Sequence, residues 1–289
     1  MYCINQFKGI HFIEHNSDKK NLPLLIILHG FPDNAFNLIS LVEKHQENFH
    51  IVAPFMPGTL NNEKRGLNQF NEMRMVHDLN DLIHFVDRDS SKEIYLLGHD
   101  LGCFASVNLY YHLRSRIKGI IHLNGLGLQQ FYSRRKSLSQ WIKSSYVLTA
   151  QFNSVRTLVA KVFPAFFLNM IYRLGQVPNH HELYEFDRKL LSPILIYSTL
   201  FKSMRNFFGR RILRIKAPTL FLWGTKDRFL NAPTLDEVDS FYDQAEVRII
   251  PGGHWVHLSN PLHTQKIINK KLSTWLRMNS QEQLFGKSL

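Results

Sequence analysis

The sequence predicts an α/β fold, in which a mostly parallel central sheet carries helices on both faces and a helical segment is inserted into the sheet domain. Short apolar runs of strand length recur along the chain. Helical patterns separate most of these runs, which is typical of parallel strands joined by crossover helices. A long middle segment has helical patterns alone. The chain has 289 residues, of which 44% are hydrophobic, so it can bury one large core.

Buried strands are expected where apolar residues run together, because a strand covered on both faces is continuously hydrophobic. A loosely alternating stretch near the N-terminus, Gln6–His15, predicts an antiparallel hairpin at the edge of the sheet. The buried strands are predicted at Leu24–Leu28, His50–Ala53, Glu93–Leu97, Gly119–Leu123, Thr219–Trp223 and Val247–Ile250.

Three helices are expected around these strands. Met73–Val86 repeats apolar residues at helical spacing, so one of its faces can pack against the sheet. Phe104–Leu113 lies shortly after a predicted strand, and Lys266–Leu276 is expected as a terminal helix. Helices in these places would cover the faces of the sheet.

The middle of the chain, residues 128–213, has no strand pattern. We interpret it as a helical cap inserted between two parts of an α/β core, residues 1–127 and 214–289. Within the cap, Phe163–Tyr172 is strongly apolar and aromatic and is expected to form the core of the cap. The alternatives for this stretch are a membrane-touching face and a wall of a substrate tunnel. The helical patterns of the cap are interrupted by Pro164, Pro178 and Pro193.

The charge of the chain is unevenly distributed. The formal net charge is +12, and the segment from Leu126 to Ile215 contains 14 Lys and Arg against 3 Asp and Glu, a net charge of +11. A basic segment favours anionic ligands or a membrane surface, although it can equally be a solvated face. We expect a small hydrophobic substrate that can be anionic, with peripheral membrane contact through the basic cap as a further role. Nucleic-acid binding is not expected, and the oligomeric state is left open.

The cysteines and the terminal segments bear on the compartment. Cys3 and Cys103 have neither the spacing of metal ligands nor that of a disulfide framework, which favours a reducing environment. The N-terminal residues lack the basic and apolar regions of a secretory signal, and no run of about 18 uncharged apolar residues predicts a spanning helix. We therefore expect a cytoplasmic protein.

The first motif that carries chemistry is Gly98–Gly102, with the sequence Gly-His-Asp-Leu-Gly. It lies between a predicted buried strand and a predicted helix, the context of a nucleophile elbow. Glycines allow the tight turn, and the residue at the apex projects from the carboxyl edge of the sheet. A serine at the apex would indicate an esterase. Here the apex is Asp100, whose carboxylate can attack an electrophilic carbon and form an ester.

The second motif is the loop His29–Pro32, which directly follows the predicted strand Leu24–Leu28. A loop in this position supplies one backbone N–H to an oxyanion hole, and the residue after the nucleophile supplies the other. The amides of Phe31 and Leu101 are therefore the expected donors. The bond between Phe31 and Pro32 is a candidate cis peptide, and His29 and Pro32 are candidate substrate contacts.

Two further motifs follow the last two predicted strands. Asp227 ends the run Trp-Gly-Thr-Lys-Asp, and it can orient a histidine by accepting its ring N–H. His254, in Gly-Gly-His-Trp, can activate water with Asp227 behind it. Trp255 is a candidate substrate contact, and His257 is a weaker candidate for the base. A turn aspartate is the simpler interpretation of either acid alone, but four motifs at four strand ends favour one catalytic site.

With these residues in place, the chain resembles the epoxide hydrolase and haloalkane dehalogenase group of α/β-hydrolases, over roughly Asn21 to Leu276. The order nucleophile, acid, histidine along the chain is the order of that fold. The His-Gly-x-Pro loop, the Gly-His-Asp-x-Gly elbow, the Trp-Gly-x-x-Asp turn, the Gly-His-Trp loop and the cap insertion all match. The resemblance implies an α/β-hydrolase fold and a covalent aspartyl-ester intermediate, with no metal and no organic cofactor.

The choice within the group depends on a few side chains. Dehalogenases hold the leaving halide with side-chain N–H donors, often directly after the nucleophile and after the His-Gly pair, where this chain has Leu101 and Phe31. Epoxide hydrolases use two cap tyrosines, for which the matching segments here contain Tyr146 and Tyr197. Ser198 stands where an Arg is common, and this departure leaves the substrate class less certain than the mechanism. Asn124 stands where some dehalogenases have their acid, which leaves Asp227 as the orienting acid.

The resemblance thus implies an enzyme that opens epoxides to vicinal diols, with Asp100 as nucleophile, Tyr146 and Tyr197 as donors to the epoxide oxygen, and His254 as base. A dehalogenase or another hydrolase with an aspartate nucleophile, such as one acting on a β-lactone, is the alternative enzyme. A binding protein that has lost the chemistry is the alternative outside enzymes.

Overall fold

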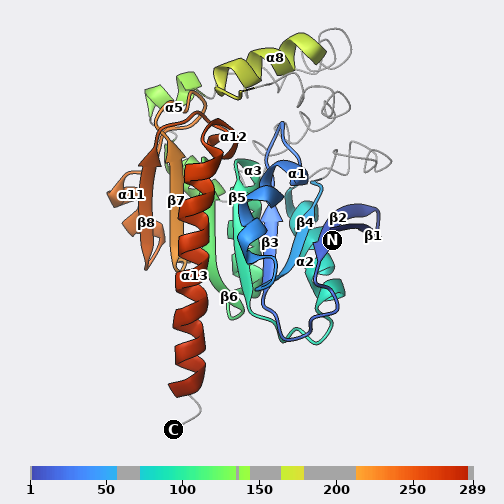
Figure 1. The fold of residues 1–289 in the computed structure, drawn as a ribbon. Helices are drawn as coiled ribbons and strands as arrows, with labels where there is room; N and C mark the ends of the chain where they lie inside the picture. Colours follow the sequence, from blue (N-terminus) through green and yellow to red (C-terminus); the bar gives the residue numbers. More distant parts are fainter. Residues whose placement is uncertain (1, 57–71, 135–136, 144–163, 179–212, 286–289) are drawn as a thin grey trace.

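The computed structural model describes residues 2–56, 72–134, 137–143, 164–178 and 213–285 (Figure 1). Its described strands form one eight-stranded sheet in the order β1-β2-β4-β3-β5-β6-β7-β8. The pairs β1–β2 and β2–β4 are antiparallel, and all the other neighbouring strands are parallel. The strands are β1 (Cys3–Phe7), β2 (Ile10–His15), β3 (Leu24–Leu28), β4 (His50–Pro54), β5 (Ile94–His99), β6 (Ile117–Leu123), β7 (Thr219–Gly224) and β8 (Ala245–Ile250).

The predicted α/β fold is confirmed, and so is the edge hairpin. The hairpin begins three residues earlier than Gln6, and β1 pairs with β2 in a register that sets Phe7 opposite Ile10. Its two-residue turn consists of Lys8 and Gly9, which both have positive φ, as tight hairpin turns require. All six predicted strands are present, with ends that differ by at most two residues. The last of them, β8, was predicted to be buried but is mostly exposed or half-buried, because it lies at the edge of the sheet.

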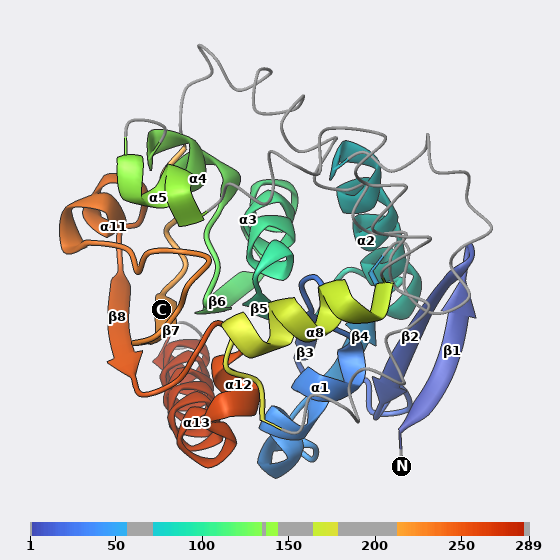
Figure 2. The same cartoon turned by 90° about the horizontal axis from the view of Figure 1, so that it is seen from above.

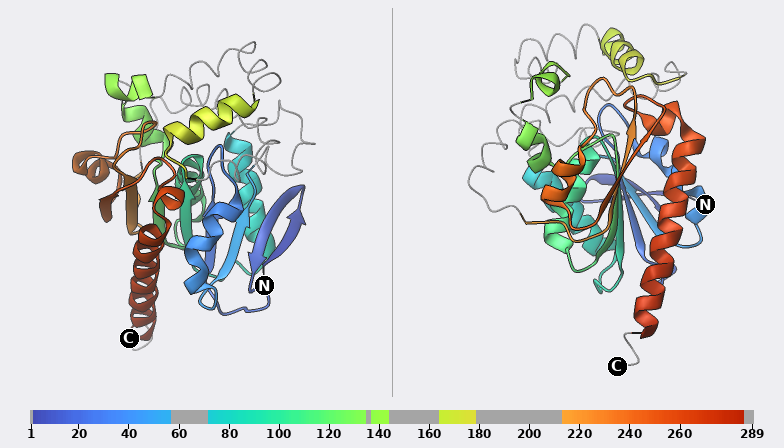
Figure 3. Two further views of the ribbon diagram at one scale, coloured as in Figure 1. Left: turned by 45° about the horizontal axis from the view of Figure 1, so that its top comes forward. Right: turned by 90° about the vertical axis from the view of Figure 1, so that its left-hand side faces the viewer.

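Helices cover both faces of the sheet, as Figures 2 and 3 show. Alternate residues of β3 point to opposite faces, so that Leu24 and Ile26 join one apolar cluster and Leu25 and Ile27 another. The first cluster includes residues of α2 (Glu72–Val86), α3 (Leu101–Leu113) and α11 (Leu235–Phe241). The second includes residues of α1 (Ala35–Ile39), the 3₁₀ helix η1 (Ser40–His45), α12 (Val256–Ser259) and α13 (Pro261–Phe285).

Two helices extend at least three residues beyond their predicted ends. Helix α3 begins at Leu101, not Phe104, because the elbow leads into the helix without an intervening loop. Helix α13 runs from Pro261 to Phe285 and extends past the sheet at its C-terminal end (Figure 1). Proline is favourable at the first position of a helix, and the polar residues after Leu276 continue the helix without needing a core.

Three described helices lie above the carboxyl ends of the parallel strands: α4 (Leu128–Ser133), α5 (Leu138–Lys143) and α8 (Pro164–Leu174) (Figure 1). Helix α8 turns Leu168, Ile171 and Tyr172 inward, where they join Trp255 in a third apolar cluster, while Phe166 is exposed. The described part of residues 128–213 contains these helices and no strand, as its pattern predicted. The cap boundaries stay a prediction. Within the described ranges, no helix is both long and apolar enough to span a bilayer.

Candidate active site

The predicted nucleophile stands at a sharp turn between β5 and α3. Asp100 has φ 50° and ψ −115°, a conformation that costs energy for a residue with a Cβ and is common at functional turns. The turn leaves no room for side chains beside it. A Cβ on Gly102 would lie 1.9 Å from the Leu28 carbonyl oxygen, and one on Gly98 would lie 2.7 Å from the Gly102 carbonyl. The two glycines of the motif are therefore required by the close approach of α3 to the sheet.

The side chains of Asp100, His254 and Asp227 meet at the carboxyl edge of the sheet. His254 Nδ1 lies 3.0 Å from Asp227 Oδ2, and His254 Nε2 lies 3.4 Å from Asp100 Oδ2. The imidazole is 2% exposed. Burial alone would lower the pKa of His254, but the two carboxylates outweigh it and raise that pKa to about 10. The histidine is therefore a cation between two carboxylates at neutral pH.

The carboxylate of Asp227 is saturated with donors. Its Oδ1 accepts the backbone N–H groups of Phe229 and Leu230 at 2.8 and 3.0 Å. Its Oδ2 accepts the Asn124 amide at 2.8 Å in addition to His254. Burial would raise the pKa of Asp227, but His254 and these hydrogen bonds lower it, so the acid stays ionised. Asn124 thus has a part in the site that the sequence did not indicate.

The two oxygens of the Asp100 carboxylate have different partners. Its Oδ1 accepts the Phe31 N–H at 3.1 Å, and the Leu101 N–H also hydrogen-bonds this side chain. Its Oδ2 faces His254. Burial opposes ionisation, but His254, His99 and the Leu101 amide lower the pKa of Asp100. The two amides predicted for an oxyanion hole thus both reach Asp100, the predicted nucleophile, and the Phe31–Pro32 bond is cis as predicted.

The other predicted residues of the site have different positions. His29 is wholly buried, with Nε2 accepting the Met56 N–H at 2.9 Å and Nδ1 2.8 Å from the Gly30 carbonyl oxygen. Because both ring nitrogens are engaged by backbone groups, His29 holds its loop, and its role as a substrate contact stays a prediction. Trp255 is 1% exposed and packs edge-on against His254 and Tyr172, so it supports the histidine from behind.

Pro32, the remaining predicted contact, accepts the Tyr172 hydroxyl at its carbonyl oxygen at 3.2 Å, which links α8 to the oxyanion loop. Tyr146 and Tyr197 lie outside the described residues, and their roles stay predictions.

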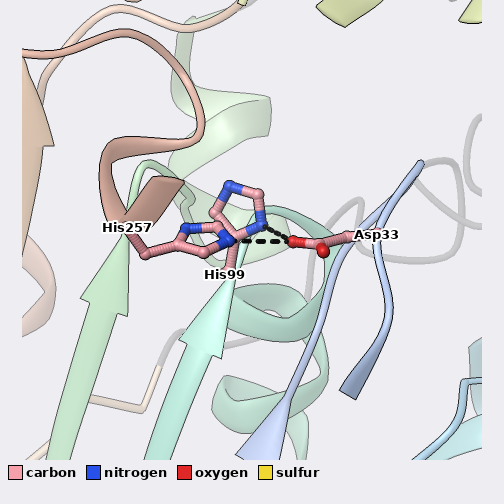
Figure 4. Close-up of side chains that lie close together, drawn as sticks. All are labelled: Asp33, His99 and His257. Atoms are coloured by element: carbon pink, nitrogen blue, oxygen red, sulfur yellow. Dashed lines mark hydrogen bonds and ion pairs between the residues drawn. The ribbon is translucent and has the colours of Figure 1, made fainter. Parts of the chain in front are cut away.

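Sequence reasoning missed a second group of titratable residues, whose side chains lie close together (Figure 4). The group is next to the site, because the rings of His99 and His254 are 5.2 Å apart. Asp33 Oδ2 lies 3.1 Å from His99 Nδ1 and 3.1 Å from His257 Nε2, and all three side chains are buried. His257 was only a weaker candidate for the base, and Asp33 was not considered. The available signal was that each residue lies within three positions of a motif residue: Pro32, Asp100 and His254.

Helix α5 holds the loop that carries Asp227. Gln140 donates to the Phe229 carbonyl at 3.1 Å and accepts the Asn231 N–H at 3.1 Å. Lys143 Nζ donates to the carbonyl oxygens of Asp227 and Leu230 at 2.8 and 3.3 Å. The helix therefore fixes the backbone of the acid loop.

A nucleophile elbow, an orienting acid and a histidine at three strand ends define a hydrolytic site on an α/β-hydrolase scaffold. The model of the family described as "alpha/beta hydrolase fold" matches residues 23–261, so the chain belongs to this family. It is an enzyme, a hydrolase of the α/β-hydrolase family.

Comparisons with individual proteins agree with this assignment. The chain is 26% identical to epoxide hydrolase 3 of Mus musculus over 268 residues, 87% of this chain and 70% of the relative. It is 26% identical to epoxide hydrolase 3 of Xenopus tropicalis over 279 residues, 90% of this chain and 74% of the relative. It is also 22% identical to human monoacylglycerol lipase ABHD6, over 85% of this chain and 74% of the relative.

Solved structures show the same fold. A Bacillus megaterium epoxide hydrolase in complex with an inhibitor superposes with a TM-score of 0.75 at 19% identity, covering 96% of this chain and 100% of the other. A putative acyltransferase from Salmonella enterica superposes with a TM-score of 0.78 at 14% identity, covering 94% and 95%. At these identities the likeness establishes the fold alone.

Proposed function

We propose that this hydrolase opens epoxides to vicinal diols through a covalent ester on Asp100. One observation carries the proposal: the residue at the elbow is a carboxylate that accepts the Phe31 N–H at Oδ1, is also hydrogen-bonded by the Leu101 N–H, and has Oδ2 facing His254. One oxygen is thereby held in place while the other is oriented toward the site. The epoxide hydrolases among the relatives of this chain support the choice of electrophile.

In the first step, Oδ2 of Asp100 bonds to one epoxide carbon as the carbon–oxygen bond of the ring breaks. The epoxide oxygen takes a proton from Tyr146 or Tyr197, the donors that the resemblance implies. The step uses the ionised form of Asp100, which the lowered pKa of this carboxyl maintains.

Ester formation then converts His254 into a base. The ester removes the charge of Asp100 and so removes one of the two carboxylates that raise the pKa of His254. The proton of His254 can pass to the tyrosinate left by the first step. The neutral imidazole, held by Asp227, is then able to accept a proton from water.

In the second step, the water oxygen bonds to the carboxyl carbon of Asp100 while His254 Nε2 takes the proton. The Phe31 and Leu101 amides, which both hydrogen-bond this carboxyl group, stabilise the oxyanion that forms. The bond from the carboxyl carbon to Oδ2 breaks, His254 protonates the departing alkoxide, and the diol leaves. The new carboxylic acid returns its proton to His254, which restores the resting ion pairs.

The test compares epoxides, haloalkanes and β-lactones as substrates of the wild type, Asp100→Asn and His254→Gln, with Asp89→Asn as an exposed control remote from the site. Asp100→Asn is expected to lose turnover by at least about a thousandfold. His254→Gln is expected to trap the ester, seen as added mass on the intact protein. Halide release without diol formation would instead assign a dehalogenase, and full activity of Asp100→Asn without deamidation would exclude this nucleophile.

A single turnover in ¹⁸O-labelled water separates the ester route from direct attack of water on the epoxide. Because water bonds to the carboxyl carbon, the label is expected in Asp100 and not in the first diol released. Label in the first diol would contradict the covalent route.

We further propose that the substrate is hydrophobic and carries a negative charge, because the segment from Leu126 to Ile215 has a net charge of +11. An epoxide of a fatty acid is then expected to have a higher kcat/KM than its methyl ester. The difference should shrink as salt is added, since screening weakens attraction between exposed charges. Equal kcat/KM at low salt would contradict this part of the proposal.

A further inference from the structure

We propose that Asp33, His99 and His257 form a buried charged hub, in which an imidazolium at His99 pairs with the Asp33 carboxylate and positions His254. The hub deepens the proposed function, because it acts on the base of that reaction. Its central claim, the protonation of His99, does not depend on any substrate.

The hub joins the three loops of the site (Figure 4). Asp33 lies in the oxyanion loop directly after Pro32, His99 ends β5 directly before Asp100, and His257 belongs to α12, which follows His254. The exposed fractions of the three residues are 1% or less. A single carboxylate thus connects the loops that carry the oxyanion donor, the nucleophile and the base.

The partners of His99 determine its protons. Its Nε2 lies 3.2 Å from the backbone carbonyl oxygen of His254, which can only accept, so Nε2 carries a hydrogen. Its Nδ1 lies at ion-pair distance, 3.1 Å, from Asp33 Oδ2. If Asp33 is ionised, Oδ2 also can only accept, so Nδ1 carries a second hydrogen and the ring is a cation.

The surroundings of Asp33 favour its ionised form. Its Oδ1 accepts the Asn34 N–H and the Asn37 side-chain amide, each at 2.8 Å. Burial opposes ionisation, but His257 and His99 outweigh it and hold the pKa of Asp33 well below its usual range. The proton of the pair therefore stays on His99.

His257 is the neutral member of the hub. Its Nε2 donates to Asp33 at 3.1 Å, which needs one ring hydrogen only. Burial and the neighbouring His99 lower the pKa of His257 to about 4. The hub thus holds one cation and one anion, and a buried pair of this kind is stable only with such further hydrogen bonds.

The same three residue types could also bind a divalent cation, because one ligand atom from each lies within 4.8 Å of the others. The distances favour protons: Asp33 Oδ2 is at hydrogen-bonding or ion-pairing distance from both histidines, and Oδ1 already has two donors. A bound metal is therefore an outcome that the experiment must exclude.

The charge of His99 acts on the base through space, and its Nε2 fixes the base through the His254 backbone. The rings of His99 and His254 are 5.2 Å apart, so a cation at His99 opposes a cation at His254 and favours the neutral base. The titratable groups that face His99 are Asp33, Asp100, His29, His254 and His257. His99 is a positioning residue, because it reaches the reacting atoms only through its neighbours.

The direct experiment is NMR of the ring nitrogens in protein with ¹⁵N-labelled histidine, between pH 6 and 9. At pH 7, His99 is expected to carry both ring hydrogens and His257 one, with assignments made by His99→Gln and His257→Gln. A neutral His99 at pH 7 would overturn the proposal. One equivalent of tightly bound zinc, measured by elemental analysis of the purified protein, would also overturn it.

The second readout is the titration of His254 in Asp100→Asn, which imitates the uncharged ester, with and without His99→Gln. Loss of the cation is expected to raise the His254 midpoint by about one pH unit, the size of a nearby-charge effect. His122→Gln serves as the control, because His122 is equally buried in β6 but bonds Ser106 away from the site. An unchanged midpoint in His99→Gln would contradict the electrostatic role.

Kinetic measurements test whether the hub affects the proposed reaction. His99→Gln is expected to slow ester hydrolysis about tenfold and to shift its acid limb upward by about one pH unit, with less effect on ester formation. If ester formation and ester hydrolysis slowed equally and the pH dependence of hydrolysis did not change, His99 would have a structural role only. Failure to turn over any epoxide would remove the proposed function but leave the NMR result standing, so the two proposals fail separately.

Discussion

At the residue scale, the site depends on a histidine held between two carboxylates. His254 lies within 3.4 Å of Asp100 and 3.0 Å of Asp227, and both carboxylates favour its cationic form. A cation cannot act as a base, so the proposed mechanism requires that one of the two charges be removed before water is activated. In that mechanism, esterification of Asp100 removes this charge, and His254 becomes a base only after the ester has formed.

This order predicts different pH dependences for the two steps. Ester formation needs ionised Asp100, whose pKa is lowered, so it should persist in weak acid. Hydrolysis needs neutral His254, so it should be lost first as the pH falls. We expect the fraction of esterified enzyme at steady state to rise several-fold between pH 8 and pH 5.5, which rapid quenching and intact-protein mass spectrometry would measure. An ester fraction that falls with decreasing pH would contradict this assignment of the base.

Asn124 offers a second prediction for a single residue. Its amide donates to Asp227 at 2.8 Å and its oxygen accepts the Gly224 N–H at 3.3 Å. Asn124→Asp keeps the shape but sets a carboxyl against Asp227, so a donor is lost and like charges meet. We expect ester hydrolysis to slow about tenfold, the size of about 1.4 kcal/mol. Asn108→Asp, on α3, is the control, and equal rates in both variants would show that Asn124 does not act through the acid.

At the scale of elements, the six-residue helix α5 depends on the loop that it holds. A helix this short has no stability of its own in water, because nucleation costs more than a few hydrogen bonds return. Gln140 and Lys143 instead bond the backbone between Asp227 and Asn231. The helix and the acid loop should therefore order each other.

Gln140→Ala tests this dependence. The change leaves the Phe229 carbonyl and the Asn231 N–H without these partners, and a buried polar group that loses its partner costs about 1–3 kcal/mol. We expect a lower Tm together with slower ester hydrolysis, because Asp227 is less well held. Leu138→Ala is the matched control, since Leu138 lies on the same helix and is 74% exposed. A lower Tm with an unchanged rate of hydrolysis would separate the helix from the acid.

At the scale of the whole molecule, features written locally in the sequence were predictable. Strand β3 is apolar at every position, and a strand of this kind is expected inside a sheet that is covered on both faces. Asp100, Asp227 and His254 could be chosen because each follows such a strand, and parallel strands bring their ends to one edge. The start of α3 was predicted at Phe104 and not at Leu101, because the pattern Gly-His-Asp-Leu-Gly is typical of a turn as far as its last glycine.

Features that depend on contacts between distant loops were not predictable. The approach of Asp33 to His99 and His257 joins three loops, and no local pattern encodes it. The partners of Gln140 and Lys143 are backbone groups, which have no sequence signature. The contacts of His29 were not predictable for the same reason, because its partners are the backbones of Met56 and Gly30.

The packing of α13 on the sheet gives a prediction that separates stability from catalysis. A Cβ on Gly119, near the start of β6, would lie 2.5 Å from Trp275 of α13, and both residues are buried far from the carboxyl edge. Gly119→Ala should therefore destabilise the fold by about 1–3 kcal/mol through overpacking. Because Leu123, at the other end of β6, continues into the site, we expect kcat to stay within about twofold at temperatures where the variant is folded. Urea unfolding measures the stability, and turnover of the same sample measures kcat.

The double variant Gly119→Ala, Trp275→Leu should recover part of the stability by making room for the new methyl group. A variant that keeps its stability but loses activity would mean that the contact between α13 and β6 is transmitted to the catalytic residues at the opposite end of the strand.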